Sequence, residues 1–205
     1  MTQNVRSIWL RPGNATASVG AIWILSRLLP RLRTAFPRAR LRVRFDGGFA
    51  APEIFAFLER EGPEYLVAMA KNQILERRAA RLMGTARRLS RESGETAHLY
   101  SECRYAASTW PERRRVVINA EVVRHPEREP KDNPNFVVTN LKQSPRHLYE
   151  AIYCLRGDIE NRFKPGSRAQ RAIGLESPTV RPPRHAPQSL EFVLETGEVF
   201  IRQSF

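Results

Sequence analysis

Apolar residues recur at helical spacing in three segments of the first half of the chain. The first segment follows Ser18, a suitable N-cap, and ends before Pro37. The second runs from Pro52 to Glu61, with Gly62 directly after it, and the third covers residues 74–89. These spacings predict three helices.

Two short apolar runs flank the second predicted helix. Residues 40–45 come before it and residues 65–70 come after it, and both runs have the composition of buried strands. A strand, helix, strand unit favours a right-handed crossover and parallel pairing of its two strands. The pattern therefore predicts an α/β fold.

The hydrophobic period changes to two after Ala97. The pattern predicts strands at His98 to Tyr105, Arg115 to Val123 and Phe136 to Thr139, separated by polar or proline-containing turns. We expect the segment from Ala97 to Asn140 to be mainly antiparallel and to stand apart from the α/β core.

The regular pattern ends after Lys164. Pro165 and Gly166 interrupt it, and further prolines follow up to Pro187. We expect residues 165–205 to be a divergent, proline-rich and disordered tail, although residues 190–205 could form a hairpin around Glu195-Thr196-Gly197.

Asp46 closes the first predicted strand and is followed directly by Gly47 and Gly48. The glycines permit positive φ and a close approach of the backbone to a ligand. Open α/β proteins place their chemistry at the carboxyl ends of strands, so Asp46 is a candidate oxygen ligand for a hard divalent cation. The alternative is that Asp46 caps the helix that follows Ala51.

A second group of polar residues lies far along the chain on a predicted helix. Tyr153, Arg156 and Glu160 are spaced i, i+3 and i+7, and Tyr149 and Lys164 extend the same stripe. The adjacent stripe is apolar and contains Leu148, Ile152, Leu155, Ile159 and Phe163. The helix can therefore bury one face and hold Glu160 beside cationic side chains.

These two segments resemble the bacterial insertion-sequence transposases with an Asp-Asp-Glu site in an RNase H-like core. The second Asp of that family ends a strand in an R-x-D-x-G-F setting, which matches the segment from Arg44 to Phe49. Its Glu lies on a helix reading Y-x-x-R-x-x-x-E, which matches Tyr153 to Glu160. The resemblance extends over roughly residues 7–164, with both motifs in the right order.

The resemblance implies a partial RNase H-like core with a mostly β insertion. Residues 1–72 and 145–164 would form the core, and residues 73–144 would form the insertion, with its basic helix and strands.

The resemblance also implies metal-dependent cleavage and transfer of DNA strands. Asp46 and Glu160 would hold Mg²⁺, or Mn²⁺ in its place, while Tyr153, Arg156 and Lys164 would bind DNA.

The sequence departs from the family at the first Asp of the triad. That Asp lies on the opening strand of the family's core, and no Asp precedes Asp46 here. We therefore expect a transposase truncated at its N-terminus, inactive by itself, with an unpaired sheet edge beside Asp46.

Two residues at the end of the second strand are further candidates. Lys71 and Asn72 would lie near the metal in the family's layout, or they could be solvated residues at a strand end. The arginines of the third predicted helix could follow a phosphate backbone or form a solvated face.

Trp110 and the three arginines after it form another candidate DNA contact. Trp110 could stack on an unpaired base while Arg113, Arg114 and Arg115 hold phosphates. Alternatively, Trp110 packs on its own strands.

The net charge favours a polyanionic partner. The chain has 34 Lys and Arg against 21 Asp and Glu, a net charge of +13 and a sequence pI of about 10.9. A coding bias toward arginine would give the same charge. DNA at transposon ends is the expected partner, and a homodimer is expected only by analogy with full-length family members. The alternatives are a non-catalytic basic DNA-binding module and a non-functional remnant, and metal dependence separates the module from the enzyme.

Cysteine usage and hydropathy indicate the compartment. Cys103 and Cys154 have no spacing typical of a zinc site, so we expect both to be buried, in a reducing cytoplasm and associated with the nucleoid. No apolar run reaches the ~18 residues of a membrane span, and the N-terminus lacks a signal-peptide pattern. We therefore expect no membrane partner.

Overall fold

The computed structural model describes residues 4–8, 20–154, 189–195 and 198–204, with side chains described for residues 20–154. The first elements are β1 (Asn4–Ile8), α1 (Ala21–Ala35), β2 (Arg40–Phe45), η1 (Gly47–Phe49), α2 (Pro52–Glu61), β3 (Glu64–Met69) and α3 (Gln73–Ser93). The later elements are β4 (Ala97–Tyr105), β5 (Arg114–Val123), β6 (Lys131–Asp132), β7 (Asn135–Thr139), α4 (Pro145–His147), η2 (Leu148–Tyr153), β8 (Ser189–Glu195) and β9 (Glu198–Ser204).

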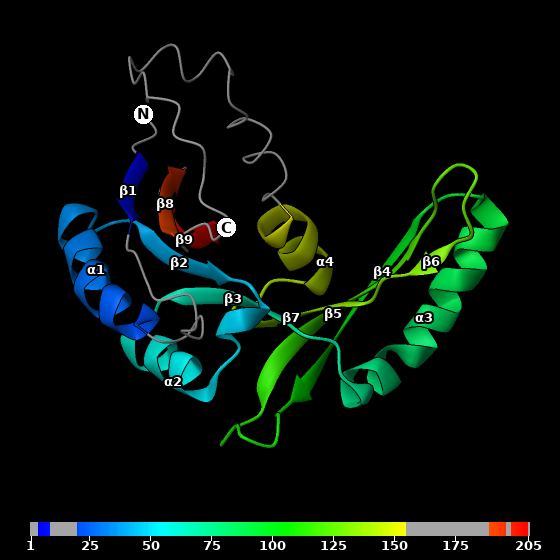
Figure 1. The fold of residues 1–205 in the computed structure, drawn as a ribbon, viewed down its shortest axis with the longest axis horizontal. Coiled ribbons are helices and arrows are strands. Elements are labelled where there is room, and N and C mark those ends of the chain that lie inside the picture. Colours follow the sequence, from blue (N-terminus) through cyan, green and yellow to red (C-terminus); the bar gives the residue numbers. More distant parts are fainter. Residues whose placement is uncertain (1–3, 9–19, 155–188, 196–197, 205) are drawn as a thin grey trace, which may run out of the picture.

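One mixed sheet connects all the described strands (Figure 1). The strand order is β1-β8-β9-β2-β3-β7-β5-β4, and β6 pairs with β5. β2 is parallel to β3, with Arg42 opposite Glu64, so the predicted parallel strand, helix, strand unit is confirmed. The fold is α/β, as predicted.

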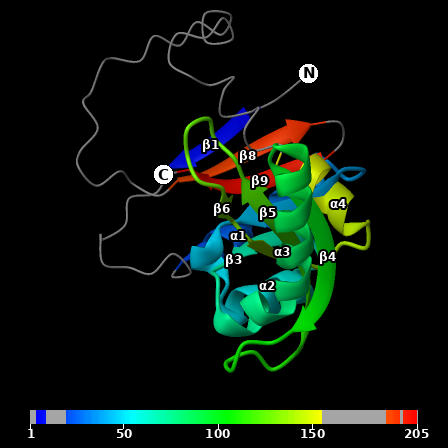
Figure 2. The ribbon, with the colours of Figure 1, turned by 90° about the vertical axis from the view of Figure 1, so that its right-hand side faces the viewer.

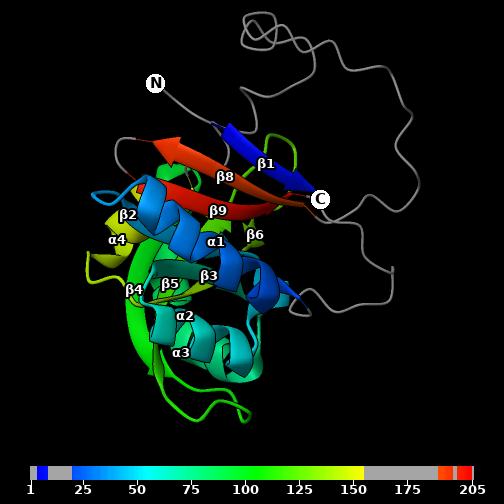
Figure 3. The same cartoon turned by 90° about the vertical axis from the view of Figure 1, so that its left-hand side faces the viewer.

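Helices cover the two faces of this sheet unequally. α1, α2 and α3 pack on one face, where the buried cluster includes Leu25, Phe55 and Met83. α4 and η2 lie on the opposite face, over a smaller cluster that includes Leu66 and Val137. Figures 2 and 3 show the sheet from its two ends, with α3 beside β4 and β5 and with α1 and α2 beside β2 and β3.

The helix boundaries follow local chain chemistry. Pro52 occupies the first turn of α2, and Gly62 ends it in the left-handed region with φ 77°. α1 begins after Gly20, and the expected N-cap Ser18 lies outside the described residues. The three predicted helices are therefore present.

The segment from Ala97 to Asn140 is antiparallel, as predicted, but it does not stand apart from the α/β core. β7 pairs with β3, with Leu66 opposite Thr139, so the strands of this segment extend the same sheet. β7 is buried on both faces, because both helical layers reach it. The prediction of a separate unit was wrong since the free edge of β3 needs a partner. The boundaries at residues 72/73 and 144/145 stay a prediction.

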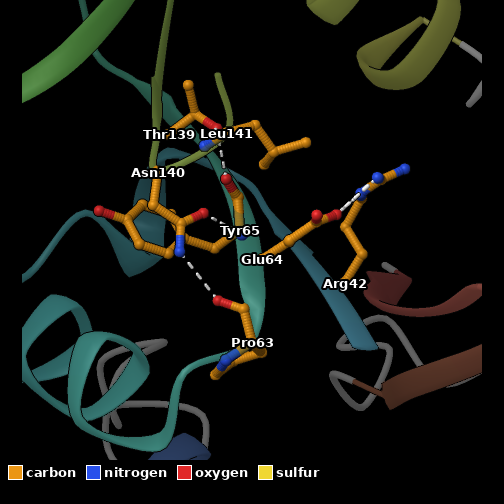
Figure 4. Close-up of polar contacts among 7 residues, drawn as sticks. All are labelled: Arg42, Pro63, Glu64, Tyr65, Thr139, Asn140 and Leu141. Atoms are coloured by element: carbon orange, nitrogen blue, oxygen red, sulfur yellow. Dashed lines mark hydrogen bonds and ion pairs between the residues drawn. The ribbon is translucent and has the colours of Figure 1, made fainter. Parts of the chain in front are cut away.

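Side-chain hydrogen bonds of Thr139 and Asn140 stabilise the junction of β7 with β3 (Figure 4). The Asn140 Oδ1 accepts from the Tyr65 backbone N–H at 2.8 Å, and its Nδ2 donates to the Pro63 carbonyl at 3.0 Å. The Thr139 hydroxyl donates to the Tyr65 carbonyl at 2.6 Å and accepts from the Leu141 N–H at 3.1 Å. These bonds satisfy backbone groups at the point where the strand ladder ends.

Replacing Asn140 with alanine is expected to lower the free energy of unfolding by about 2 kcal/mol, because two backbone groups lose their partner. Denaturant unfolding followed by circular dichroism measures the change. Lys142→Ala, at an exposed position two residues away, is the matched control. Equal effects of the two substitutions would contradict this role of Asn140.

The C-terminal residues contribute two strands to the sheet. β8 and β9 form an antiparallel hairpin, which confirms the hairpin expected for residues 190–205. β9 also pairs in parallel with β2, with Arg40 opposite Glu198 and Val43 opposite Ile201. The expected unpaired edge beside β2 is therefore wrong, because β9 occupies it. Residues 165–188 lie outside the described residues.

Candidate functional site

Asp46 follows directly after β2 and is half-buried. Its Oδ1 accepts a hydrogen bond from the Gly48 N–H at 2.8 Å and caps the short 3₁₀ helix η1. The N-cap of α2 is Ala51, so the Asp46 side chain caps η1 and not α2. Asp46 thus combines a capping role with a position at the carboxyl end of a central strand.

The backbone after Asp46 does not use the positive φ angles that its two glycines permit. Gly47 and Gly48 are not among the residues with positive φ in the described part of the chain, because η1 turns the chain in the right-handed region. A Cβ on Gly47 would lie 3.7 Å from backbone atoms of Ala68 and Ala70, which is an ordinary contact. The turn after β2 therefore lies against the end of β3.

Residues on β2 alternate between the two faces of the sheet. Val43 and Phe45 belong to the cluster under α1 to α3, so Arg42, Arg44 and Asp46 lie on the opposite face, which η2 covers. Arg42 is buried and donates from Nε and Nη2 to the Glu64 carboxylate at 2.9 and 2.6 Å. This face of β2 is therefore polar although it is buried.

Arg44 joins the two sequence motifs. Its side chain donates from Nη1 to the carbonyls of Ile152 and Tyr153, at 3.3 and 2.8 Å, and the residue is only 8% exposed. Its guanidinium carbon lies 6.0 Å from the centre of the Tyr153 ring. Arg44, two residues before Asp46, thus holds the segment that carries Tyr153 against the strand that carries Asp46.

The segment that precedes Glu160 begins as a helix and widens. Ser144 caps α4, and η2 ends with a bond from the Cys154 N–H to the Tyr149 carbonyl at 2.8 Å, five residues back. Such π-turns are frequent at functional sites. Leu148 and Ile152 are buried, as the apolar stripe predicted.

Only Tyr149 and Tyr153 of the predicted polar stripe lie among the described residues, and both contact the apolar cluster under η2. Tyr149, placed on the polar face, is buried between Tyr100 and Tyr153, with ring centroids 5.7 and 5.3 Å away, and burial raises its pKa. Tyr100 of β4 covers the Tyr149 ring, a long-range contact that helical spacing alone does not reveal. Arg156, Glu160 and Lys164 lie outside the described residues.

Cys154 lies at the end of this segment and is exposed, so the expectation that it is buried was wrong. Cys103, the other free cysteine, is partly buried.

Lys71 and Asn72 lie in the turn between β3 and α3, beside the end of β3 that contacts Gly47. The Asn72 Oδ1 accepts from the Leu75 N–H at 3.0 Å and caps α3. Lys71 is exposed, and its Nζ lies 3.4 Å from the Asn133 Oδ1. Asn72 therefore has a structural role as the N-cap of α3. Lys71 places an exposed positive charge at this edge of the sheet.

Trp110 is buried in the core under α2. It packs edge to face on Phe55 and Tyr105, with ring centroids 4.8 and 5.7 Å apart. This geometry supports the alternative that Trp110 packs on its own strands, and we leave it out of the proposed DNA contacts.

The three arginines after Trp110 have different environments. Arg114 is 5% exposed and forms a bidentate pair with Glu59, at 2.7 and 2.8 Å. Arg115 bonds to Glu102 and to the backbone carbonyls of Leu141 and Gln143. Arg113 is exposed, so it alone of the three presents a free surface position.

The Glu59 pair gives a pH-dependent prediction. Burial alone would raise the pKa of Glu59, but hydrogen bonds from Arg114 and Tyr65 outweigh this effect and hold the pKa below its usual value. The stabilisation is therefore complete above the unfolded pKa of about 4.3 and is lost as the pH falls through the lower folded pKa. Glu59→Gln should cost about 1–2 kcal/mol of unfolding free energy at pH 7, because Arg114 is buried but the Glu59 side chain is 35% exposed and partly screened by solvent.

Unfolding curves at pH 7 and pH 3 measure this effect. The difference between the chain and Glu59→Gln should shrink at the lower pH, while the exposed Glu53→Gln on the same helix should have little effect at either. A difference that is equal at both pH values would contradict the account.

Comparison with known protein families shows the family to which this chain belongs. The family model described as transposase DDE domain group 1 matches residues 1–177. The chain belongs to this transposase DDE domain family. No curated protein and no solved structure matched the chain.

Membership of the DDE transposase family gives the general function. The family acts in transposition, its chemistry is phosphoryl transfer on DNA, and it uses divalent metal ions. None of the described helices has both the length and the apolar character of a membrane span.

The described residues fit a family metal site only in part. The Asp46 carboxylate makes one hydrogen bond and keeps capacity to act as an oxygen ligand for Mg²⁺. Within the part of the chain that the structure describes, no group of three or more His, Cys, Asp or Glu side chains could hold a metal. Glu160, the second carboxylate that the motif predicts, lies outside the described residues.

Sequence reasoning missed the role of Arg44, although it lies inside a motif. Arg40, Arg42 and Arg44 alternate with apolar residues, which is the signal of a strand with one polar face. That signal indicates the face, but the contact with Ile152 and Tyr153 depends on a segment more than a hundred residues away.

Proposed function

We propose that Asp46 and Glu160 belong to a DDE site for metal-dependent cleavage and transfer of DNA strands. The observation that carries this proposal is the contact of Arg44 with Ile152 and Tyr153. It ties the strand that ends at Asp46 to the beginning of the Y-x-x-R-x-x-x-E segment.

Each proposed residue has a distinct role. Asp46 and Glu160 would hold Mg²⁺, or Mn²⁺ in its place, and the metal would supply charge stabilisation for phosphoryl transfer. Tyr153 and Arg156 position a DNA phosphate, since a guanidinium can make bidentate contacts, and Lys164 adds a positive charge. Lys71 is the proposed cation at the neighbouring strand end.

We further propose that the 205-residue chain alone does not cut DNA. Strand β9, which pairs with β2, supports this. When its register is continued along β2 toward Asp46, the next residues of β9 are Arg202, Gln203 and Ser204. The carboxylate residue of β9, Glu198, is opposite Arg40, about 20 Å along the strand from Asp46. β9 therefore offers no third acid at the required level.

A non-catalytic DNA-binding module is the second candidate function. The exposed arginines of α3 favour it, because Arg77, Arg81 and Arg91 face solvent on one helix, whereas Arg88 lies beside the Glu92 carboxylate. DNA that meets such a surface binds without sequence preference, through counterion release. Cytoplasmic location and nucleoid association follow from a DNA partner in either case.

The test is DNA binding and nicking with transposon-end DNA and Mg²⁺ or Mn²⁺. We expect weak binding that falls steeply with salt, an increase of affinity on adding Mn²⁺, and no nicking. Asp46→Asn and Glu160→Gln should each remove the increase, whereas Glu53→Gln should keep it. Binding that ignores the cation in all variants would favour the module.

Nicking would contradict the proposed inactivity of the chain. If nicking disappears in both Asp46→Ala and Glu160→Ala, the site assignment holds and only the inactivity fails.

A further inference from the structure

A pocket lies between the C-terminal half of α3 and the strands β5 and β6. Figure 1 shows this end of α3 beside β6. The volume of the pocket is about 510 Å³. Its lining includes Arg87, Ser90 and Arg91 of α3, Val122 of β5, and Arg124 and Asp132. Three guanidiniums and one carboxylate thus surround one hollow.

Arg124 is held in a fixed position at this pocket. Its Nε donates to the Ser90 hydroxyl at 2.8 Å, and that hydroxyl donates to the Glu95 carbonyl at 2.8 Å. Ser90 is fully buried, and the Arg124 backbone N–H donates to Thr96 Oγ1 at 2.9 Å. The Nε bond leaves the two terminal nitrogens of Arg124 available as further donors.

The two arginines of α3 complete the charge of the pocket. Arg87 donates from Nε and Nη2 to Asp132, at distances down to 2.5 Å, so one positive charge is balanced. Arg91 lies one helical turn further along on the same face and is exposed. Arg91 and Arg124 therefore give the lining an excess of two positive charges over Asp132.

We propose that this pocket binds a phosphodiester group of the DNA backbone. Guanidinium N–H groups match phosphate oxygens in geometry and charge, and a hollow with preset donors loses less entropy on binding than mobile surface arginines. The inference rests on the DNA substrate of the proposed function and assigns a contact away from Asp46.

The position of the pocket sets the scale of this contact. Nineteen helical steps from Asn72 to Arg91 correspond to about 28 Å along α3. The contact positions the duplex and reads no base sequence.

The experiment measures DNA affinity of the full chain against salt concentration, for the unsubstituted protein and for three variants. Arg91→Gln should reduce the slope of log affinity against log salt by about 1. Arg88→Gln is the matched control, because Arg88 is an exposed arginine of the same helix outside the pocket lining, near Glu92 at 3.9 Å. Asp132→Asn should increase affinity, since Arg87 loses its counter-charge.

The outcomes separate this inference from the proposed function. Equal losses in Arg91→Gln and Arg88→Gln overturn the pocket and leave the catalytic proposal untouched. No DNA binding by the unsubstituted chain overturns both. Inorganic phosphate is the second probe, and NMR follows the Arg91 and Arg124 side chains while phosphate is added. If phosphate saturates these side chains but Arg91→Gln leaves DNA binding unchanged, DNA is overturned as the source of the bound phosphate.

Discussion

Arg44→Ala is expected to lower the free energy of unfolding by about 2–4 kcal/mol, because a buried guanidinium that donates to two carbonyls is lost and leaves both acceptors without this donor. The segment from Leu148 to Tyr153 should open locally before the sheet unfolds, since its last carbonyls lose their donor. Hydrogen exchange of the Cys154 amide, which bonds to the Tyr149 carbonyl, reports this opening.

Arg40→Ala is the control for this prediction. Arg40 begins the same strand, is exposed and lies on the same face by alternation. Arg44→Lys should recover little, because an ammonium on a flexible stem does not reproduce the guanidinium geometry. Unchanged exchange at Cys154 in Arg44→Ala would contradict the link between the two motifs.

Ile201→Pro is expected to release the C-terminal hairpin from β2, with a loss of at least about 3 kcal/mol, because proline cannot donate to a ladder inside a sheet. Ile201 is opposite Val43 on β2 and Phe192 on β8, so β9 has partners on both sides. The freed edge of β2 should then promote aggregation. Thermal unfolding and size-exclusion chromatography measure both effects.

Phe205→Pro, beyond the last residue of β9, is the control and should leave the chain monodisperse. If Ile201→Pro melts and elutes like this control, β9 does not stabilise the sheet, and the edge beside β2 needs another explanation.

Hydrophobic period predicted most elements of this fold. The helices α2 and α3 and the strands β4, β5 and β7 lie where the pattern placed them, because each has a long and regular apolar face. The π-turn at η2 could not be predicted in this way, since a single wider turn leaves no mark in the period. The buried position of Tyr149 depends on Tyr100 of β4, which lies far from it in the sequence.

Long-range pairing was the part that sequence did not reveal. β9 pairs with β2 across more than 150 residues, and nothing local to either strand specifies that partner. The same holds for β7 and β3, whose pairing joins the antiparallel segment to the α/β sheet.

Some residues had two interpretations that local sequence could not separate. Trp110 next to three arginines fits a base-stacking site as well as a core aromatic, and only its contacts with Phe55 and Tyr105 distinguish the two. Asp46 was predicted correctly at the end of a strand, but its bond to Gly48 assigns the cap to η1.

The central claim is that Asp46 and Glu160 belong to one metal site, and Mn²⁺ binding followed by electron paramagnetic resonance tests it most directly. The full chain is titrated beside Asp46→Asn, Glu160→Gln and the control Glu53→Gln. We predict that Asp46→Asn and Glu160→Gln each lose the same binding step, because two carboxylates share the ion, and that the control retains it. Binding by either Asp46→Asn or Glu160→Gln with the affinity of the unsubstituted chain would contradict the claim.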